Sequence, residues 1–222
     1  MPRFTVTNDE IVFDDGGMNL LSSEALHELR SAVEQLRGPV VVFRSGRPNV
    51  FAAGADMAEM ARFTPFDAYE FARLGQTVFA MIEKLPFITV AMIDGDCFGG
   101  ALDLILSFDL RYATPRARFS HPGAKLGIVT GFGGTSRWRK VLTRPSAHQL
   151  FLANRVFFAE EAQSFGLIDG LSKGIGEPDL DRLKSLDPAT TQLVKELTNR
   201  APRLSPRELL LIAERLGSYL DN

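Results

Sequence analysis

Two continuous apolar runs, at residues 39–43 and 87–93, constrain the fold more than any other feature of the chain. Apolar runs of this length between turn-forming residues predict strands that are buried on both faces, as in a parallel sheet covered by helices. Ser22 predicts the N-cap of a helix over 22–36, and a second helix is expected over 65–84. Strands that alternate with helices in this way indicate an α/β fold.

The other expected elements are short. The sequence predicts a hairpin from 4–6 and 11–13, a loop over 46–54, strands at 110–113 and 117–120, helices over 101–108, 188–200 and 205–219, and a further helix capped by Thr135 or Ser136. After Gly170 the composition becomes more polar, and two amphipathic helices are expected in that part of the chain.

The net charge and the cysteine count limit the kinds of partner and the cell compartment that we expect for this protein. A formal net charge of -2 gives no basic surface for nucleic acid, so none is expected as a partner. Cys97 is the single cysteine, which excludes an intrachain disulfide and favours a reducing compartment. The sequence has no signal-peptide pattern and no apolar stretch near the ~20 residues that span a bilayer. We therefore expect a cytoplasmic protein without a membrane segment. No metal site is expected either, because no His/Cys cluster has the spacing of metal ligands.

Two glycine-containing segments, 51–60 and 93–104, give the first indication of a functional site. In each, small residues stand where a strand or loop passes into a helix, which exposes backbone N–H groups at a helix N-terminus. Two such groups from different segments can converge on one oxygen and stabilise the oxyanion that forms when a thioester becomes an enolate. The alternative is two ordinary glycine turns. Neither a G-x-G-x-x-G motif after a first strand nor a G-K-[ST] motif is present.

Four motifs follow one another along the chain: A-G-A-D-x-x-x-M at 53–60, D-G-x-x-x-G-G-A-x-D at 94–103, P-G-x-x-x-G-x-x-T-G-x-G-G-T at 122–135 and A-x-x-x-G-L-I at 162–168. In this order they resemble the crotonase (enoyl-CoA hydratase/isomerase) superfamily. The matching family segments read A-G-A-D-x-x-x-M, N-G-x-x-x-G-G-G-x-[ED], P-E-x-x-x-G-x-x-P-G-x-G-G-T and A-x-x-x-G-L-[VI]. Asn19-Leu20 followed by Ser22 is a weaker match to an early family segment.

The resemblance, which spans about residues 10 to 170, implies a crotonase-like spiral of β-β-α units over 1–170 and a shortened helical section over 171–222. It implies a homotrimer or hexamer. It also implies an acyl-CoA substrate, with no tightly bound cofactor other than the coenzyme A carried by that substrate. In the family, the oxyanion is held by the amides matching Ala55 and Gly100. Coenzyme A is expected to contact five consecutive residues, Ala53, Gly54, Ala55, Asp56 and Met57. Its phosphates have four candidate partners, Arg62, Lys84, Arg116 and Arg118, and the sequence gives no reason to prefer one of them.

The catalytic acids depart from the family pattern. Enoyl-CoA hydratases use two glutamates, which match Asp103 and Gly123 here, so one carboxylate is a methylene shorter and the other is absent. Loss of a positioned acid or base typically costs about 10² to 10⁴ in rate. The resemblance therefore favours single-carboxylate isomerase or decarboxylase chemistry on Asp103 over hydration, and a non-catalytic acyl-CoA-binding or assembly protein is the alternative. His121 and Gly123 are expected to line the acyl pocket, where His121 is either a replacement base or a structural residue.

Overall fold

The two apolar runs form the centre of a six-stranded sheet. Strands β4 (Val40–Ser45) and β7 (Ile88–Ile93) are parallel neighbours, with Val40 opposite Ile88, and β7 is buried along its whole length. The prediction of strands buried on both faces is confirmed for this pair. The computed structural model describes residues 2–172, 180–199, 207 and 211.

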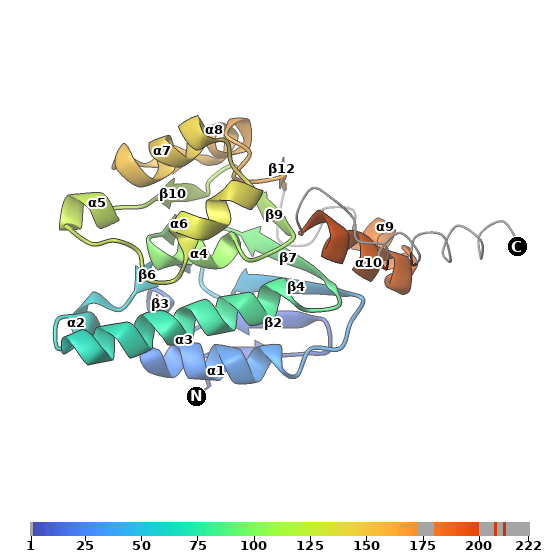
Figure 1. Ribbon diagram of the computed structural model, residues 1–222, viewed down its shortest axis with the longest axis horizontal. Helices are drawn as coiled ribbons and strands as arrows, with labels where there is room; N and C mark the ends of the chain where they lie inside the picture. The colour runs from blue at the N-terminus through green and yellow to red at the C-terminus, as the bar shows by residue number, and fades with distance from the viewer. Residues whose placement is uncertain (1, 173–179, 200–206, 208–210, 212–222) are drawn as a thin grey trace, which may run out of the picture.

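The two main sheets are linked by a repeating path of the chain (Figure 1). The large sheet has the order β1-β2-β4-β7-β9-β12, parallel except for the hairpin β1–β2; the second sheet has the order β11-β10-β8-β5, and β3 pairs with β6. Strands β4, β7 and β9 are each followed by a strand of the second sheet, and helices then lead back to the large sheet. This is the predicted spiral of β-β-α units. The remaining strands are β1 (Phe4–Val6), β2 (Glu10–Phe13), β3 (Leu20–Leu21), β5 (Val50–Ala52), β6 (Gly54–Ala55), β8 (Asp96–Phe98), β9 (Leu110–Ala113), β10 (Arg118–Ser120), β11 (Phe157–Phe158) and β12 (Gly170–Leu171).

Helices α1 (Ser23–Val33) and α3 (Pro65–Glu83) lie side by side along one face of the large sheet (Figure 1). Ser22 caps α1 by accepting a hydrogen bond from the amide of Ala25, as the sequence predicts. A capping box between Thr64 and Asp67, with Pro65 in the first turn, fixes the start of α3. The shorter helices are α2 (Met57–Met60), α4 (Gly100–Ile105), α5 (Gly123–Leu126), α6 (Gly134–Arg137), α7 (Arg144–Leu152) and α8 (Ala159–Ser164), with a 3₁₀ turn at Trp138–Lys140.

The other face of the large sheet is covered by helices α9 (Leu180–Lys184) and α10 (Pro188–Thr198), which lie beside β4 and β7 (Figure 1). Leu180 and Leu183 pack against a second cluster of buried side chains on the sheet. Lys195 of α10 forms an ion pair with Asp109 at 2.7 Å. Burial on both faces explains why β4 and β7 have no polar alternation in sequence.

Three sequence predictions need correction or lie outside the described residues. The segment 46–54 is not all loop, because β5 lies within it and pairs with β8. Neither Thr135 nor Ser136 caps a helix: α6 begins at Gly134 after Gly133, whose φ of 95° only glycine adopts readily. The helix predicted over 188–200 is present as α10, and the one predicted over 205–219 lies almost entirely outside the described residues.

The division of the chain at residue 170 stays a prediction. Strand β12 (Gly170–Leu171) crosses that position and pairs in parallel with β9 at the edge of the large sheet.

Candidate functional site

A cavity of about 380 Å³ lies where α3, β6, the start of α4 and the segment from His121 to Phe132 meet. Its walls are made by glycine, alanine, proline, methionine, phenylalanine and branched aliphatic residues. In the described part of the chain, only His121 and Thr130 add polar side chains to these walls. A largely apolar cavity with a few convergent polar groups is the usual form of a small-molecule site.

The backbone amides of Ala55 and Gly100 come together at one edge of this cavity. The amide of Asp56 donates to Leu21 of β3 at 3.3 Å, and since successive amides of a strand point in opposite directions, the amide of Ala55 faces away from β3. Gly100 is the first residue of α4, so its N–H has no partner within the helix. A Cβ atom built on Gly100 would lie 3.4 Å from the nitrogen of Ala55.

Two glycines make this approach possible. Gly54 has a φ of 94°, and a Cβ atom on it would lie 2.6 Å from the carbonyl oxygen of Phe98 and 2.9 Å from the nitrogen of Gly100. Gly99 has a φ of 53° and precedes α4 as its N-cap. Glycine adopts both backbone conformations readily, and at Gly54 its lack of a side chain also permits the close contact between the two chain segments.

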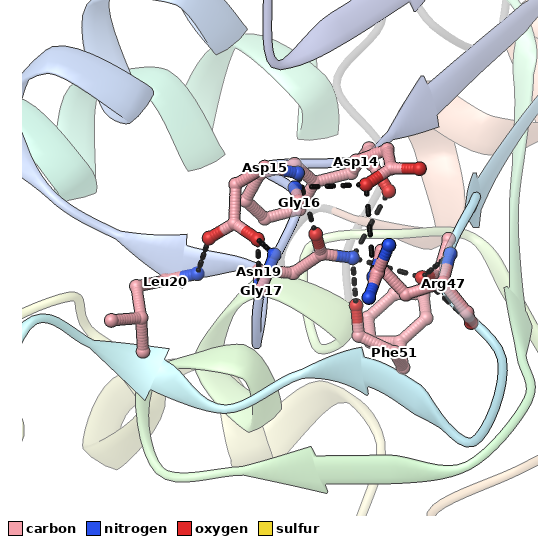
Figure 2. Close-up of polar contacts among 10 residues, drawn as sticks. Asp14, Asp15, Gly16, Gly17, Asn19, Leu20, Arg47 and Phe51 are labelled. Carbon is pink, nitrogen blue, oxygen red and sulfur yellow. Dashed lines mark hydrogen bonds and ion pairs between the residues drawn. The ribbon is translucent and has the colours of Figure 1, made fainter.

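A buried asparagine holds β3, and through β3 the position of β6 (Figure 2). Asn19 has a φ of 53°, and its side-chain amide donates to the carbonyls of Phe13 and Phe51 at 3.0 Å and to the hydroxyl of Ser45 at 2.8 Å. The carboxylate of Asp15 accepts from the amides of Asn19 at 2.9 Å and Leu20 at 2.8 Å. Three segments of the chain are therefore tied to the strand that aligns Ala55.

The five residues predicted to contact coenzyme A form one short segment beside the cavity, which runs from Ala53 through β6 to the first residue of α2. Ala53, Ala55 and Met57 line it. Asp56 instead caps α2, accepting from the amides of Ala58 at 2.9 Å and Glu59 at 3.0 Å. The side chain of Asp56 thus shapes the loop, while Gly54 provides its close contact with α4.

Asp103 lies behind the cavity wall. Its side chain is completely buried, and it is not among the residues that line the cavity. Oδ2 accepts a hydrogen bond from the hydroxyl of Thr130, whereas Oδ1 has no hydrogen-bond partner within the described residues. Burial raises the pKa of Asp103 to about 7, although the hydroxyl of Thr130, nearby backbone amides and the charge of Arg137 oppose the rise. The predicted acid is therefore close to the cavity but separated from it by Thr130.

His121 and Gly123 both line the cavity, as predicted. Burial lowers the pKa of His121, whose Nε2 atom lacks a hydrogen-bond partner in the described structure and lies 3.8 Å from Oδ1 of Asp103. A Cβ atom on Gly123 would lie 2.7 Å from the carbonyl oxygen of Ile128 and 3.0 Å from Cε1 of His121. The space in which a side chain at position 123 would begin is already occupied.

Phe132 forms the floor of the cavity. Its ring packs edge-on against Phe71 and Phe79, with ring centroids 5.0 and 5.5 Å away. A Cβ atom on Gly75 would lie 2.2 Å from this ring, and one on Gly100 would lie 2.9 Å from it. The ring therefore fills the space between α3 and α4 against both backbones.

Sequence reasoning missed Thr130. The available signal was a departure from the motif, because Thr130 stands where the resembling family segment has proline. Two proposed phosphate partners are engaged elsewhere: Arg116 forms an ion pair with Asp94, and Arg118 forms one with Asp96.

The described residues offer neither a cluster of metal ligands nor a membrane-spanning helix. Over residues 2–172 and 180–199, no group of three or more His, Cys, Asp or Glu side chains could hold a metal ion. None of the helices in the described part of the chain is both long and apolar enough to cross a membrane.

Comparison with known proteins identifies the family. The family model for enoyl-CoA hydratase/isomerase matches residues 9–175. Methylglutaconyl-CoA hydratase from mitochondria of Mus musculus is 34% identical over 175 residues, which cover 77% of this chain and 56% of the relative. Crotonyl-CoA hydratase from Syntrophomonas wolfei is 34% identical over 68% of this chain and 60% of its own length.

Solved structures agree in fold. Enoyl-CoA hydratase from Thermoplasma volcanium superposes with a TM-score of 0.88 at 25% identity, covering 98% of this chain and 93% of that protein. DspI from Pseudomonas aeruginosa has a TM-score of 0.84 at 23% identity over 100% of this chain and 95% of its own, a likeness of fold alone. The fold is thus that of a crotonase-type protein. The chain belongs to the enoyl-CoA hydratase/isomerase family, and it spans about half the length of the mitochondrial relatives that it matches.

Proposed function

We propose that the cavity binds an acyl-CoA thioester and stabilises its enolate. The thioester oxygen would accept hydrogen bonds from the amides of Ala55 and Gly100, which meet at the cavity edge, and the positive end of α4 would favour the negative charge. Coenzyme A would lie along the loop from Ala53 to Met57. Membership of the family and the largely apolar walls support this assignment.

The reaction that we favour is migration of a double bond from C3 to C2 of the acyl chain. The observation that carries this choice is at Gly123, where a side chain would collide with the carbonyl of Ile128, so the second glutamate of a hydratase has no space. One acid suffices for isomerisation, since it can return at one carbon the proton removed from another. With a pKa of about 7, Asp103 is present in both protonation states near neutral pH.

Decarboxylation, the other single-acid reaction, is less well supported. Its substrate would bring a carboxylate into a cavity where no described wall residue carries a positive charge. Burying an unpaired charge costs several kcal/mol. We therefore propose a neutral, apolar acyl chain. The homotrimer or hexamer implied by the family resemblance, and the cytoplasmic location expected from the composition, remain proposals as well.

A panel of crotonyl, 3-enoyl, malonyl-type and saturated acyl-CoA thioesters tests this function. Chromatography with mass spectrometry separates the reactions, because hydration adds water, decarboxylation removes CO₂, and isomerisation changes retention without changing mass. We expect conversion of the 3-enoyl thioester, and we expect Asp103→Asn to bind it without turnover. Hydration of crotonyl-CoA at ordinary enzymatic rates would overturn the choice of reaction.

Binding without turnover of any thioester would instead support the non-catalytic acyl-CoA-binding alternative. The absence of any thermal shift with every CoA ligand would refute the assignment of the cavity itself.

A further inference from the structure

A row of phenylalanine rings leads away from the oxyanion amides along one side of the cavity. A Cβ atom on Gly100 would lie 2.9 Å from the ring of Phe132, so this ring stands next to the proposed position of the thioester. Measured between centroids, the ring of Phe71 lies 5.0 Å from that of Phe132, and the ring of Phe63 lies 5.2 Å from that of Phe71. All three phenylalanines line the cavity. An acyl chain that starts at Gly100 can therefore follow them as far as Phe63.

A second cavity, of about 330 Å³, begins on the other side of Phe63 and Phe71. It lies between α1 and α3, and these two phenylalanines line it as well as the first cavity. The remaining walls of this second cavity are mostly polar, since they include Arg30 and the ion pair between Glu70 and Arg73. Phe63 and Phe71 therefore form a partition between an apolar cavity and a charged one.

Phe63 is the part of this partition that stands at the edge of the core. Phe71 is only 6% exposed, whereas Phe63 is partly exposed and immediately precedes Thr64, the N-cap of α3. The amide of Phe63 donates to the carbonyl of Met60 at 3.1 Å, and the capping box of α3 fixes the next residue. The backbone at Phe63 is thus held by its chain neighbours, so a substitution there removes the ring and leaves the course of the chain in place.

We propose that Phe63 sets the maximum length of the acyl chain, and that the substrate carries a hydrocarbon chain that ends against Phe63 and Phe71. The proposal rests on the placement of the thioester at Ala55 and Gly100 proposed above. Each methylene group that leaves water for the apolar cavity should strengthen binding by about fourfold. A chain that reaches past the partition would meet charged side chains and the water around them, so its further methylene groups gain nothing. Affinity should therefore rise with chain length up to a limit set by the partition, and then stop rising.

Calorimetric titration with saturated acyl-CoA thioesters, from butyryl-CoA to dodecanoyl-CoA, measures this limit, with free CoA as the baseline. Saturated thioesters have no double bond to move, so binding is measured without turnover. The test compares Phe63→Ala, which removes the ring, with Phe66→Ala as the matched control. Phe66 stands in the first turn of α3, is 70% exposed and lines neither cavity. Phe63→Leu is a milder change that keeps an apolar side chain against the core.

We expect Phe63→Ala to move the limit to chains about two to four carbons longer, because the space of the missing ring joins the two cavities. Thioesters longer than the wild-type limit should then bind about 15-fold more tightly to Phe63→Ala than to the wild type. Phe63→Leu should move the limit less and in the same direction, and Phe66→Ala should leave it unchanged. Butyryl-CoA, the shortest member of the series, should bind all of these proteins with similar affinity. Thermal melts of each variant verify folding.

A limit that stays at the same chain length in both Phe63 variants would overturn the proposal. So would a wild type whose affinity rises without a break up to the longest chain, or an equal shift of the limit in Phe66→Ala. In each of these cases the thioesters still bind more tightly than free CoA, so the proposed acyl-CoA site remains. If no thioester binds more tightly than free CoA, the acyl-CoA site itself fails, and this proposal fails with it.

Discussion

Burial of Asp103 predicts an unusual dependence of stability on pH, which the substitution Asp103→Asn should abolish. The carboxyl group is fully buried, and burial raises its pKa from an ordinary 3.8 to about 7. Between these values the folded protein holds a proton that the unfolded chain has released. The stability gained from this group is therefore present at low pH and is lost as pH rises through about 7.

The magnitude follows from the two pKa values. Relative to a permanently ionised group, Asp103 contributes about 3 kcal/mol at about pH 5 and almost nothing at about pH 8. Asparagine has a similar shape and does not titrate. The difference in unfolding free energy between wild type and Asp103→Asn should therefore change by about 3 kcal/mol between these conditions, and the wild type should become less stable relative to the variant as pH rises.

Urea denaturation of both proteins at several pH values measures this difference. Groups elsewhere titrate equally in the two proteins, so their contributions cancel in the comparison. The contributions of the groups that interact with Asp103 do not cancel in this way. The charge of Arg137 lowers the pKa of Asp103. Burial is the main cause of the raised pKa of Cys97, and the charges of Asp96 and Asp103 add to it. A difference that is constant with pH, or that grows in favour of the wild type as pH rises, would refute the buried, proton-holding carboxyl group.

Three further predictions concern the backbone around the cavity. Gly54→Ala should lose about 2–5 kcal/mol of stability and bind CoA thioesters more weakly, because a Cβ atom would lie 2.6 Å from the carbonyl oxygen of Phe98 at a φ of 94°; urea denaturation and calorimetric titration measure the two effects. Asn19→Ala should cost about 2–4 kcal/mol through lost hydrogen bonds and a left-handed backbone, with faster amide exchange at Leu20; Asn19→Gly, which accepts that backbone, should lose less. Gly123→Glu should destabilise the fold by about 1–3 kcal/mol and gain no crotonyl-CoA hydration, because its Cβ atom would lie 2.7 Å from the carbonyl oxygen of Ile128; efficient hydration by this variant would contradict the steric argument.

The local elements were largely predictable from sequence. The apolar runs of β4 and β7, the cap at Ser22 and the start of α3 at Pro65 all rest on short-range chemistry that the sequence states directly. The pairing of strands was not predictable from sequence. Strand β5 is a strand only through its pairing with β8, which lies more than forty residues further along the chain. The spiral itself was foreseen from the family motifs rather than from any pattern of hydrophobicity.

The candidate site was predictable in part, for a similar reason. Motif order led to Ala55 and Gly100, and the structure brings these residues together at the cavity edge. Sequence alone gave no indication that Asp103 would lie behind the wall, because the direction of a side chain at the start of α4 depends on the segment that packs over it. That segment carries Thr130, and its contact with Asp103 joins positions 27 residues apart.

The ring of Phe132, packed between α3 and α4, limits how this cavity can change during evolution or design. Additional bulk at Gly75 or Gly100 would collide with the ring, so the floor accepts new shapes only when two or three positions change together. The opening is different: Val129 is 81% exposed and Leu126 is 54% exposed. Single substitutions that alter the preferred acyl group should therefore accumulate at the rim, while the floor keeps the backbone N–H groups of Ala55 and Gly100 in position.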